Sequence, residues 1–284
     1  MGCNFRGVRF DLESLTVKVR DINIHLKRNH IGAEKKVVFL HGFTGSSSTW
    51  EEVVNYLPPT IEILTIDLIG HGQTSKPTDF TRYYVDEQIE DLHSLFQLLG
   101  WNHFTLVGYS MGGRLALAYA DKYGVDKLVL ESSSPGLADE EERVKRKHAD
   151  ELLAERILNE GISAFIDFWE NIPLFHSQKK LSFEKQQSIR LERLAGSEVG
   201  LSNSLKGFST GVQPSYWGKL KDMEISTILL TGELDQKFCD IAINMKNVLP
   251  QGKHMQINNV GHAFHVENPE LFATIVEDII LKED

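Results

Sequence analysis

A serine at position 110 lies in the stretch FTLVGYSMGGRLALAYADKY, residues 104–123. Its first four residues form an apolar run typical of a strand, and residues 113–123 have the pattern of a helix. A G-x-S-x-G sequence between a strand and a helix favours a sharp turn, because glycines on both sides of the serine let the backbone bend tightly. An ordinary Gly-Ser loop is the alternative, which these flanking elements disfavour. We therefore expect Ser110 to project from a strained turn at the N-terminus of a helix.

Short β-branched runs alternate with helical patterns along most of the chain. This alternation is typical of an α/β fold with a mostly parallel sheet covered by helices on both faces. Two weaker runs, residues 16–20 and 23–26, are expected to form an antiparallel hairpin. The remaining expected strands are residues 36–40, 62–67, 104–109, 127–131, 227–231 and 254–258, and the expected helices are residues 50–56, 85–99, 113–123, 237–248 and 269–281.

The alternation stops between residues 137 and 217, where the sequence is charged, amphipathic and helical, as in residues 139–158. We interpret residues 138–213 as a helical cap inserted into a core of residues 1–137 and 214–284. Open α/β sheets bind ligands in the crevice outside the carboxyl ends of their strands. A cap inserted after a strand therefore covers the place where a ligand is expected.

Composition excludes several classes of function. The 284 residues are 41% hydrophobic and 25% charged, which is ordinary for a globular protein. Thirty Lys and Arg stand against 40 Asp and Glu, a net charge of −10, which argues against nucleic acid or an anionic membrane as a partner. A small anionic ligand remains compatible with this charge, because a pocket can hold a local cluster of arginines.

The cysteines and the apolar runs indicate the compartment. Cys3 and Cys239 are too few for a disulfide framework or a cysteine-based metal site, so we expect free thiols. No apolar run is long enough to span a membrane, and residues 1–6 lack the apolar stretch of a signal peptide. We expect a cytoplasmic protein without membrane insertion. The apolar face of the amphipathic cap can pack on the core or on a second copy of the chain, so the sequence allows a monomer or a homodimer.

A catalytic serine needs a base, and the base needs a carboxylate to orient it. Asp235 follows an expected strand in LTGELD, and His262 follows the last expected strand in VGH. His265 is an alternative base three residues further on, and Asp240 is a weaker rival acid because it lies within an expected helix. Asp235 and His262 are therefore the predicted partners of Ser110.

An oxyanion that forms beside the serine needs fixed hydrogen-bond donors. The sequence HGFTG, residues 41–45, follows an expected strand, so the backbone N–H groups of Phe43 and Met111 are the candidate oxyanion hole. His41 and Asp67 also follow strands. We interpret His41 as a structural turn residue and Asp67 as part of a turn with the following GHG.

Taken together, the motifs HGF, GYSMGG, LTGELD and GHAFHVENP resemble the α/β-hydrolase fold superfamily over nearly the whole chain. The resemblance implies a mostly parallel central sheet with an inserted helical cap. It also implies that Ser110, Asp235 and His262 converge as a catalytic triad. The superfamily includes esterases, C–C bond hydrolases, lyases and receptors, so the fold leaves the reaction open.

Arginines suggest an anionic substrate. Arg114 directly follows the serine motif, in the first turn of a helix, where burial of its charge is costly unless an anion pairs with it. A salt bridge to a nearby carboxylate is the alternative. Further arginines occur in the cap, within ERVKRK at 142–147 and LERL at 191–194.

The cap region carries a more specific resemblance. GYSMGGR, the SPGL of residues 134–137, Trp169 and the GELDxKF stretch that ends at Phe238 resemble the 2-succinyl-6-hydroxy-2,4-cyclohexadiene-1-carboxylate synthases of menaquinone biosynthesis. That family implies a tricarboxylate substrate, 2-succinyl-5-enolpyruvyl-6-hydroxy-3-cyclohexene-1-carboxylate, which loses pyruvate without a metal or organic cofactor. The substrate-binding residues that it implies are Tyr109, Arg114, Arg146, Trp169 and Arg193, with Arg143 an alternative to Arg146.

The resemblance also implies roles for the triad. Ser110, polarised by His262, would remove the ring proton next to the succinyl ketone. Asp235 would orient His262, and the Phe43 and Met111 N–H groups would hold the enolate oxygen. Two alternatives stay open: a serine hydrolase, either an esterase or a C–C bond hydrolase, that acts on an anionic substrate, and a binding protein that uses the same pocket as a receptor.

Overall fold

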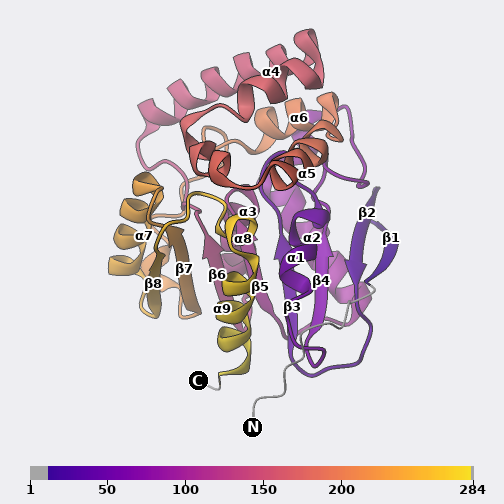
Figure 1. Cartoon of the computed structure of the whole chain (residues 1–284), viewed down its shortest axis with the longest axis vertical. Coiled ribbons are helices and arrows are strands. Elements are labelled where there is room, and N and C mark those ends of the chain that lie inside the picture. The colour runs from indigo at the N-terminus through magenta and orange to yellow at the C-terminus, as the bar shows by residue number, and fades with distance from the viewer. Residues whose placement is uncertain (1–11, 283–284) are drawn as a thin grey trace.

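A twisted eight-stranded sheet forms the centre of the computed structural model, which describes residues 12–282 (Figure 1). Its strand order is β1-β2-β4-β3-β5-β6-β7-β8. The first two strands form an antiparallel hairpin, the second pairs antiparallel with β4, and all the other pairs are parallel. The strands are β1 (Glu13–Val19), β2 (Ile22–Arg28), β3 (Lys36–Leu40), β4 (Glu62–Ile66), β5 (Thr105–Tyr109), β6 (Lys127–Glu131), β7 (Ser226–Gly232) and β8 (Gly252–Ile257).

Helices cover both faces of the sheet, as the alternation predicted. The core helices are α1 (Glu51–Val54), α2 (Val85–Leu99), α3 (Met111–Tyr123), α7 (Gln236–Val248), α8 (Phe264–Glu267) and α9 (Pro269–Leu281). Successive side chains of β3 enter opposite clusters: Val38 and Leu40 pack with α2, α3 and α7, whereas Val37 and Phe39 pack with α1 and α9. Burial on both faces explains the continuous apolar runs of the strands.

Most boundaries lie within one to three residues of the expected ones, and two of the helices differ for an identifiable reason. The helix expected at residues 50–56 is a 3-10 helix, η1 (Ser47–Trp50), followed by the short α1. The helix expected at residues 113–123 already begins at Met111, because the serine turn leads directly into it. His265 lies in the separate helix α8, since Asn268 accepts a hydrogen bond from Leu271 N and so caps the start of α9.

Residues 138–213 contain helices and no strand, and we propose these bounds for the cap. Its elements are α4 (Glu140–Trp169), η3 (Pro173–Lys180), α5 (Phe183–Leu194) and α6 (Glu198–Phe208). Asp139 caps α4, and Gly161, at φ 83°, breaks it into two parts. Ala154, Ile157 and Leu201 belong to the apolar cluster that joins α4 to α6. The cap helices lie together at one end of the sheet (Figure 1).

A half-buried carboxylate ties the cap to the core. Glu192, on α5, accepts hydrogen bonds from the backbone N and the Oγ of Ser46, at 3.0 and 2.8 Å. Ser46 lies one residue beyond the HGFTG loop, so this contact joins the cap to the loop that carries Phe43. Burial raises the pKa of Glu192 above its ordinary value of 4.5, although the Ser46 hydrogen bonds oppose the shift.

A Glu192→Gln variant tests the stability cost of this charge. A raised pKa means that the folded state holds the proton more tightly than the unfolded chain, so stability falls as the pH rises through the raised pKa. Glutamine Oε1 can accept the same bonds without the charge. We expect the variant to have a higher Tm than the wild type at pH 8 and the same Tm near pH 4.5. A difference that instead widens toward acid pH would contradict this account.

Two expectations concern cysteines and membranes. Cys239 is a buried free thiol whose Sγ lies 3.3 Å from Thr231 Oγ1, whereas Cys3 lies outside the described residues. Between residues 12 and 282 no helix has the length and apolar character needed to cross a membrane.

Candidate active site

Ser110 occupies a strained turn between β5 and α3. Its φ is 49°, in the left-handed region, and it is the N-cap residue of α3. A Cβ at Gly112 would lie 2.4 Å from the carbonyl oxygens of Leu40 and His41, and a Cβ at Gly108 would lie 2.5 Å from Gly112 O. The glycines of the motif are therefore required by close backbone approach as well as by the turn.

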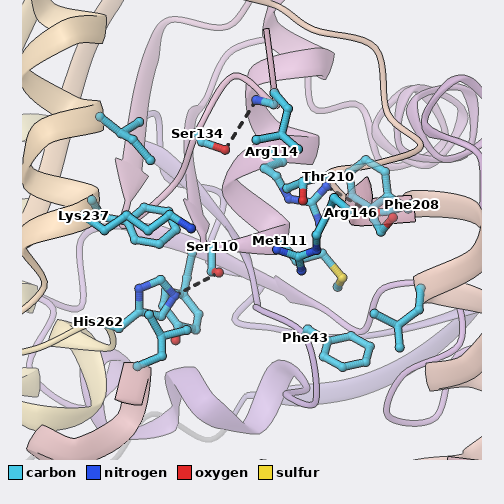
Figure 2. A pocket seen from close by; sticks show the side chains of 18 of the residues that line it. Phe43, Ser110, Met111, Arg114, Ser134, Arg146, Phe208, Thr210, Lys237 and His262 are labelled. Atoms are coloured by element: carbon cyan, nitrogen blue, oxygen red, sulfur yellow. Dashed lines mark hydrogen bonds between the residues drawn. The ribbon is translucent and has the colours of Figure 1, made fainter. Parts of the chain in front are cut away.

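The structure brings the three predicted triad residues together (Figure 2). Ser110 Oγ lies 3.1 Å from His262 Nε2, and His262 Nδ1 lies 2.6 Å from Asp235 Oδ2. His262 is only 1% exposed and Asp235 is also buried. This geometry allows a proton to move between the serine and the imidazole, with the carboxylate orienting the ring.

The rival residues have other partners. His265 Nδ1 lies 2.8 Å from the Glu131 carboxylate and its Nε2 lies 3.0 Å from Thr49 Oγ1, so both of its ring nitrogens are occupied. Asp240 accepts a hydrogen bond from Gln236 on its own helix. Neither residue lies in the hydrogen-bond chain of Ser110.

His41 and Asp67 are structural turn residues, as expected. His41 Nε2 accepts a hydrogen bond from Leu68 N at 3.0 Å, and burial lowers the pKa of its ring. Asp67 accepts hydrogen bonds from the backbone N of Ser47 at 2.6 Å and of Gln73 at 2.8 Å. These bonds fix the loops after β3 and β4.

The two candidate oxyanion donors lie on neighbouring loops. Phe43 belongs to the turn after β3, which Gly45 N closes onto Gly42 O at 3.1 Å, and Met111 begins α3. Among residues 12–282, neither the Phe43 nor the Met111 backbone N–H has a hydrogen-bond partner. Both residues line the cavity above Ser110, so the two donors are available to a ligand.

A cavity of about 460 Å³ lies over the serine, between the strand ends and the cap. It has the mainly apolar wall and the few polar groups that are usual for a small-molecule site. Its aromatic wall consists of Phe43, Tyr109, Trp169, Phe175, Phe208, Trp217 and Phe238, and its charged residues are Arg114, Glu142, Arg146 and Lys237.

Arg114 lies in this wall without a carboxylate partner among the described residues. Its guanidinium donates to Phe208 O at 3.0 Å and to Gln213 Oε1, and it packs over the Phe208 ring at 4.5 Å. Burial, and then the positive charge of Arg146, lower the pKa of Arg114 to about 9. The alternative interpretation, a salt bridge to a neighbouring carboxylate, does not describe this arginine. Its charge is held at a cost that a bound anion would offset.

Arg146, rather than Arg143, lines the cavity. Arg146 Nε donates to Asp150 Oδ2 at 2.7 Å, and its side chain reaches the cavity wall near Arg114 (Figure 2). Arg143 Nη1 instead donates to Leu137 O at 3.2 Å and does not line the cavity. The structure thereby separates two residues that the sequence left as alternatives.

Comparisons with known proteins show the family of this chain. The alpha/beta hydrolase fold model matches residues 35–269. A Bacillus subtilis (strain 168) protein, provisionally named 2-succinyl-6-hydroxy-2,4-cyclohexadiene-1-carboxylate (SHCHC) synthase, is 42% identical over 87% of this chain and 91% of its own length. The SHCHC synthase of Enterobacter sp. (strain 638) is 31% identical over 86% of this chain and 91% of its own.

The fold of this chain is similar to that of several solved structures. The structure of MenH from S. aureus matches with a TM-score of 0.85 and 35% identity, over 89% of this chain and 96% of that chain. A thermophilic esterase from Thermogutta terrifontis matches with a TM-score of 0.78 at 22% identity, which shows the shared fold alone. The chain belongs to the SHCHC synthase family of α/β hydrolases.

One residue implied by the SHCHC synthase family does not line the cavity. Arg193 Nη2 donates to Gln178 Oε1 at 3.0 Å, and its guanidinium packs against the Phe175 ring at 4.4 Å. Phe175 lines the main cavity, whereas Arg193 lines a second cavity of about 280 Å³ within the cap. Phe175 therefore lies between Arg193 and the space above Ser110.

Tyr109 and Trp169 both line the main cavity. The Tyr109 ring packs 5.4 Å from that of His262, and burial raises the pKa of its phenol well above the ordinary value. Trp169 packs edge-on against Phe43 at 5.4 Å. The Trp169 Nε1–H is buried and meets no acceptor in the described part of the chain. It is thus a donor that a ligand could satisfy.

Sequence reasoning gave no role to several polar residues that line the cavity of this SHCHC synthase family member. Glu142, Thr210 and Lys237 all line it. Lys237 had a signal in the sequence, because it lies two residues after Asp235 within GELDxKF. Thr210 opens the stretch TGVQP, residues 210–214, which also resembles the family, but whether its side chain faces the cavity depends on how the chain returns from the cap to the core.

Proposed function

We propose that this protein eliminates pyruvate from 2-succinyl-5-enolpyruvyl-6-hydroxy-3-cyclohexene-1-carboxylate and so forms SHCHC in menaquinone biosynthesis. The observation that carries the proposal is Arg114, a half-buried cation that has no carboxylate partner among residues 12–282 and faces the cavity of a Ser-His-Asp triad. The names of the Bacillus and Enterobacter relatives support the same reaction.

The proposed mechanism uses the triad as a base. Ser110 Oγ takes the ring proton next to the succinyl ketone and passes its own proton to His262, 3.1 Å away. Asp235, 2.6 Å from His262 Nδ1, stabilises the imidazolium. The electron pair of the broken C–H bond moves onto the ketone oxygen, where the Phe43 and Met111 N–H groups hold the enolate.

Collapse of the enolate completes the elimination. The electron pair returns to form the first ring double bond, the existing double bond shifts, and the carbon–oxygen bond to the enolpyruvyl group breaks. The departing enolpyruvate takes a proton and becomes pyruvate. These steps involve no acyl-enzyme and call for no cofactor or metal.

Arg114 and Arg146 are the proposed carboxylate-binding residues within the cavity, with Tyr109 and Trp169 positioning the ring. Arg193 does not line this cavity, and its guanidinium packs against the Phe175 ring. Cytoplasmic location, and the choice between monomer and homodimer, remain predictions.

A serine hydrolase that acts on an anionic substrate is the second candidate. The hydrogen bond between Ser110 and His262 supports a hydrolase as well as it supports the lyase, because the same contact activates a serine for attack on a carbonyl. The two candidates differ in products, since a hydrolase consumes water and does not form a conjugated diene.

The enolpyruvyl substrate, generated enzymatically, tests the proposal. Conjugated-diene absorbance and pyruvate release are followed in the same reaction with and without the protein. We expect both signals to rise together, in equal amounts, well above the spontaneous rate. Ester cleavage without any acceleration of pyruvate release would contradict the lyase proposal.

A further inference from the structure

The cations of the cavity differ in what they already bind. Arg114 donates to Phe208 O and Gln213 Oε1, and Arg146 is paired with Asp150 at 2.7 Å. Lys237, the third cation of the wall, forms no hydrogen bond or ion pair through its side chain with any residue between 12 and 282, and its ammonium lies 5.8 Å from the Phe238 ring. Its ammonium group is therefore the cation most available to a ligand.

Lys237 lies on the His262 side of the serine. It is the second residue of α7, which begins directly after Asp235, and the neighbouring Phe238 ring packs 4.6 Å from the His262 ring. Figure 2 shows Lys237 on one side of Ser110, and the Arg114 and Arg146 side chains on the other. The lysine and the two arginines thus lie on opposite sides of the reacting serine.

Lys237 lies where a positive charge does not stabilise the folded protein, in the first turn of α7. A helix N-terminus carries a partial positive charge, so a cation in the first turn is unfavourable. The one carboxylate beside it in sequence, the N-cap Asp235, is bound to His262 at 2.6 Å. A bound anion at this point would satisfy both the helix terminus and the ammonium group.

We propose that Lys237 binds one of the three carboxylates of the substrate, on the side of Ser110 opposite to Arg114 and Arg146. The inference rests on the proposed function. Two arginines in the cavity leave one of three carboxylates without a cation, and Phe175 separates Arg193 from that cavity. The long, exposed side chain of Lys237 lets its ammonium reach a carboxylate beside His262.

Steady-state kinetics of Lys237→Met, with Lys237→Arg alongside, test the assignment. Loss of one charged hydrogen-bond partner predicts a rise in KM of about tenfold with a smaller change in kcat. The arginine variant should recover most of this loss. Lys246→Met is the matched control, because Lys246 lies on the same helix but outside the cavity wall. An unchanged KM for Lys237→Met, or an equal effect of Lys246→Met, would overturn the assignment.

A binding measurement separates this inference from the reaction itself. Isothermal titration with citrate, a stable tricarboxylate, is run on the wild type and on both methionine variants. We expect about tenfold weaker citrate binding for Lys237→Met only. Equal binding by all three proteins, or none by the wild type, would overturn the inference. If the wild type released no pyruvate but Lys237→Met alone lost citrate affinity, the proposed reaction would fail and the anion site would stand.

Discussion

Replacement of Ser110 by alanine should lower kcat/KM for pyruvate elimination by at least about 1000-fold. In the proposed mechanism Ser110 Oγ is the atom that takes the substrate proton, and it lies 3.1 Å from His262 Nε2, to which it passes its own proton. Without it, the proton next to the ketone has no base in contact. Diene formation and pyruvate release, measured on the same samples, check this prediction.

The fold should tolerate this change. Serine and alanine pay a similar cost for the positive φ of 49° at position 110, and the backbone bond from Ser110 N to Glu131 O at 2.9 Å is retained. We expect the Tm of Ser110→Ala to lie close to that of the wild type. A variant with a normal Tm and near-normal turnover would rule out the serine as the base.

Replacement of Arg114 by methionine should change activity and stability in opposite directions. Loss of a buried, charge-assisted contact with a carboxylate predicts a fall of about 100-fold in kcat/KM, mainly through KM. The same substitution removes a buried charge whose burial lowers its pKa to about 9, so the Tm should rise. Enzyme kinetics and thermal unfolding of one preparation measure both effects.

Arg143→Met is the matched control for Arg114→Met. Arg143 lies outside the cavity and donates to backbone carbonyls of Leu137 and Ala138. We expect it to leave kcat/KM within about twofold of the wild type and to lower the Tm slightly, because those bonds are lost. Equal losses of kcat/KM in the two variants would mean that Arg114 has no special contact with the substrate.

The triad could be predicted from the sequence because each member is fixed by a short local pattern. Ser110 is placed by the glycines around it, and Asp235 and His262 each lie in the loop that follows a parallel strand. The carboxyl ends of parallel strands meet at one edge of a sheet, so residues far apart in sequence converge there without further information.

The cap could be predicted only in outline. Its helical character is readable from composition, but the direction of each side chain depends on how the helices pack on the core. Arg193 shows this limit, because a ring on η3, Phe175, lies between it and the cavity. Arg143 and Arg146, one helical turn apart, could not be distinguished until the path of α4 was known.

Lys237 was missed for a different reason. It lies within the family-like stretch GELDxKF, but a lysine after a strand is most often a solvated surface residue. Only the cavity wall and the lack of a partner for its ammonium within the described chain give it a role. Such a residue is identified by what surrounds it rather than by its own sequence pattern.

In the proposed reaction the triad abstracts a proton and does not hydrolyse a bond. Turnover in water enriched in oxygen-18, followed by mass spectrometry of the six-membered-ring product, tests it most directly. Elimination forms no bond to water, so we predict that the diene product carries no solvent oxygen in its carboxylates. A newly formed carboxylate containing oxygen-18, in place of the diene, would contradict the account.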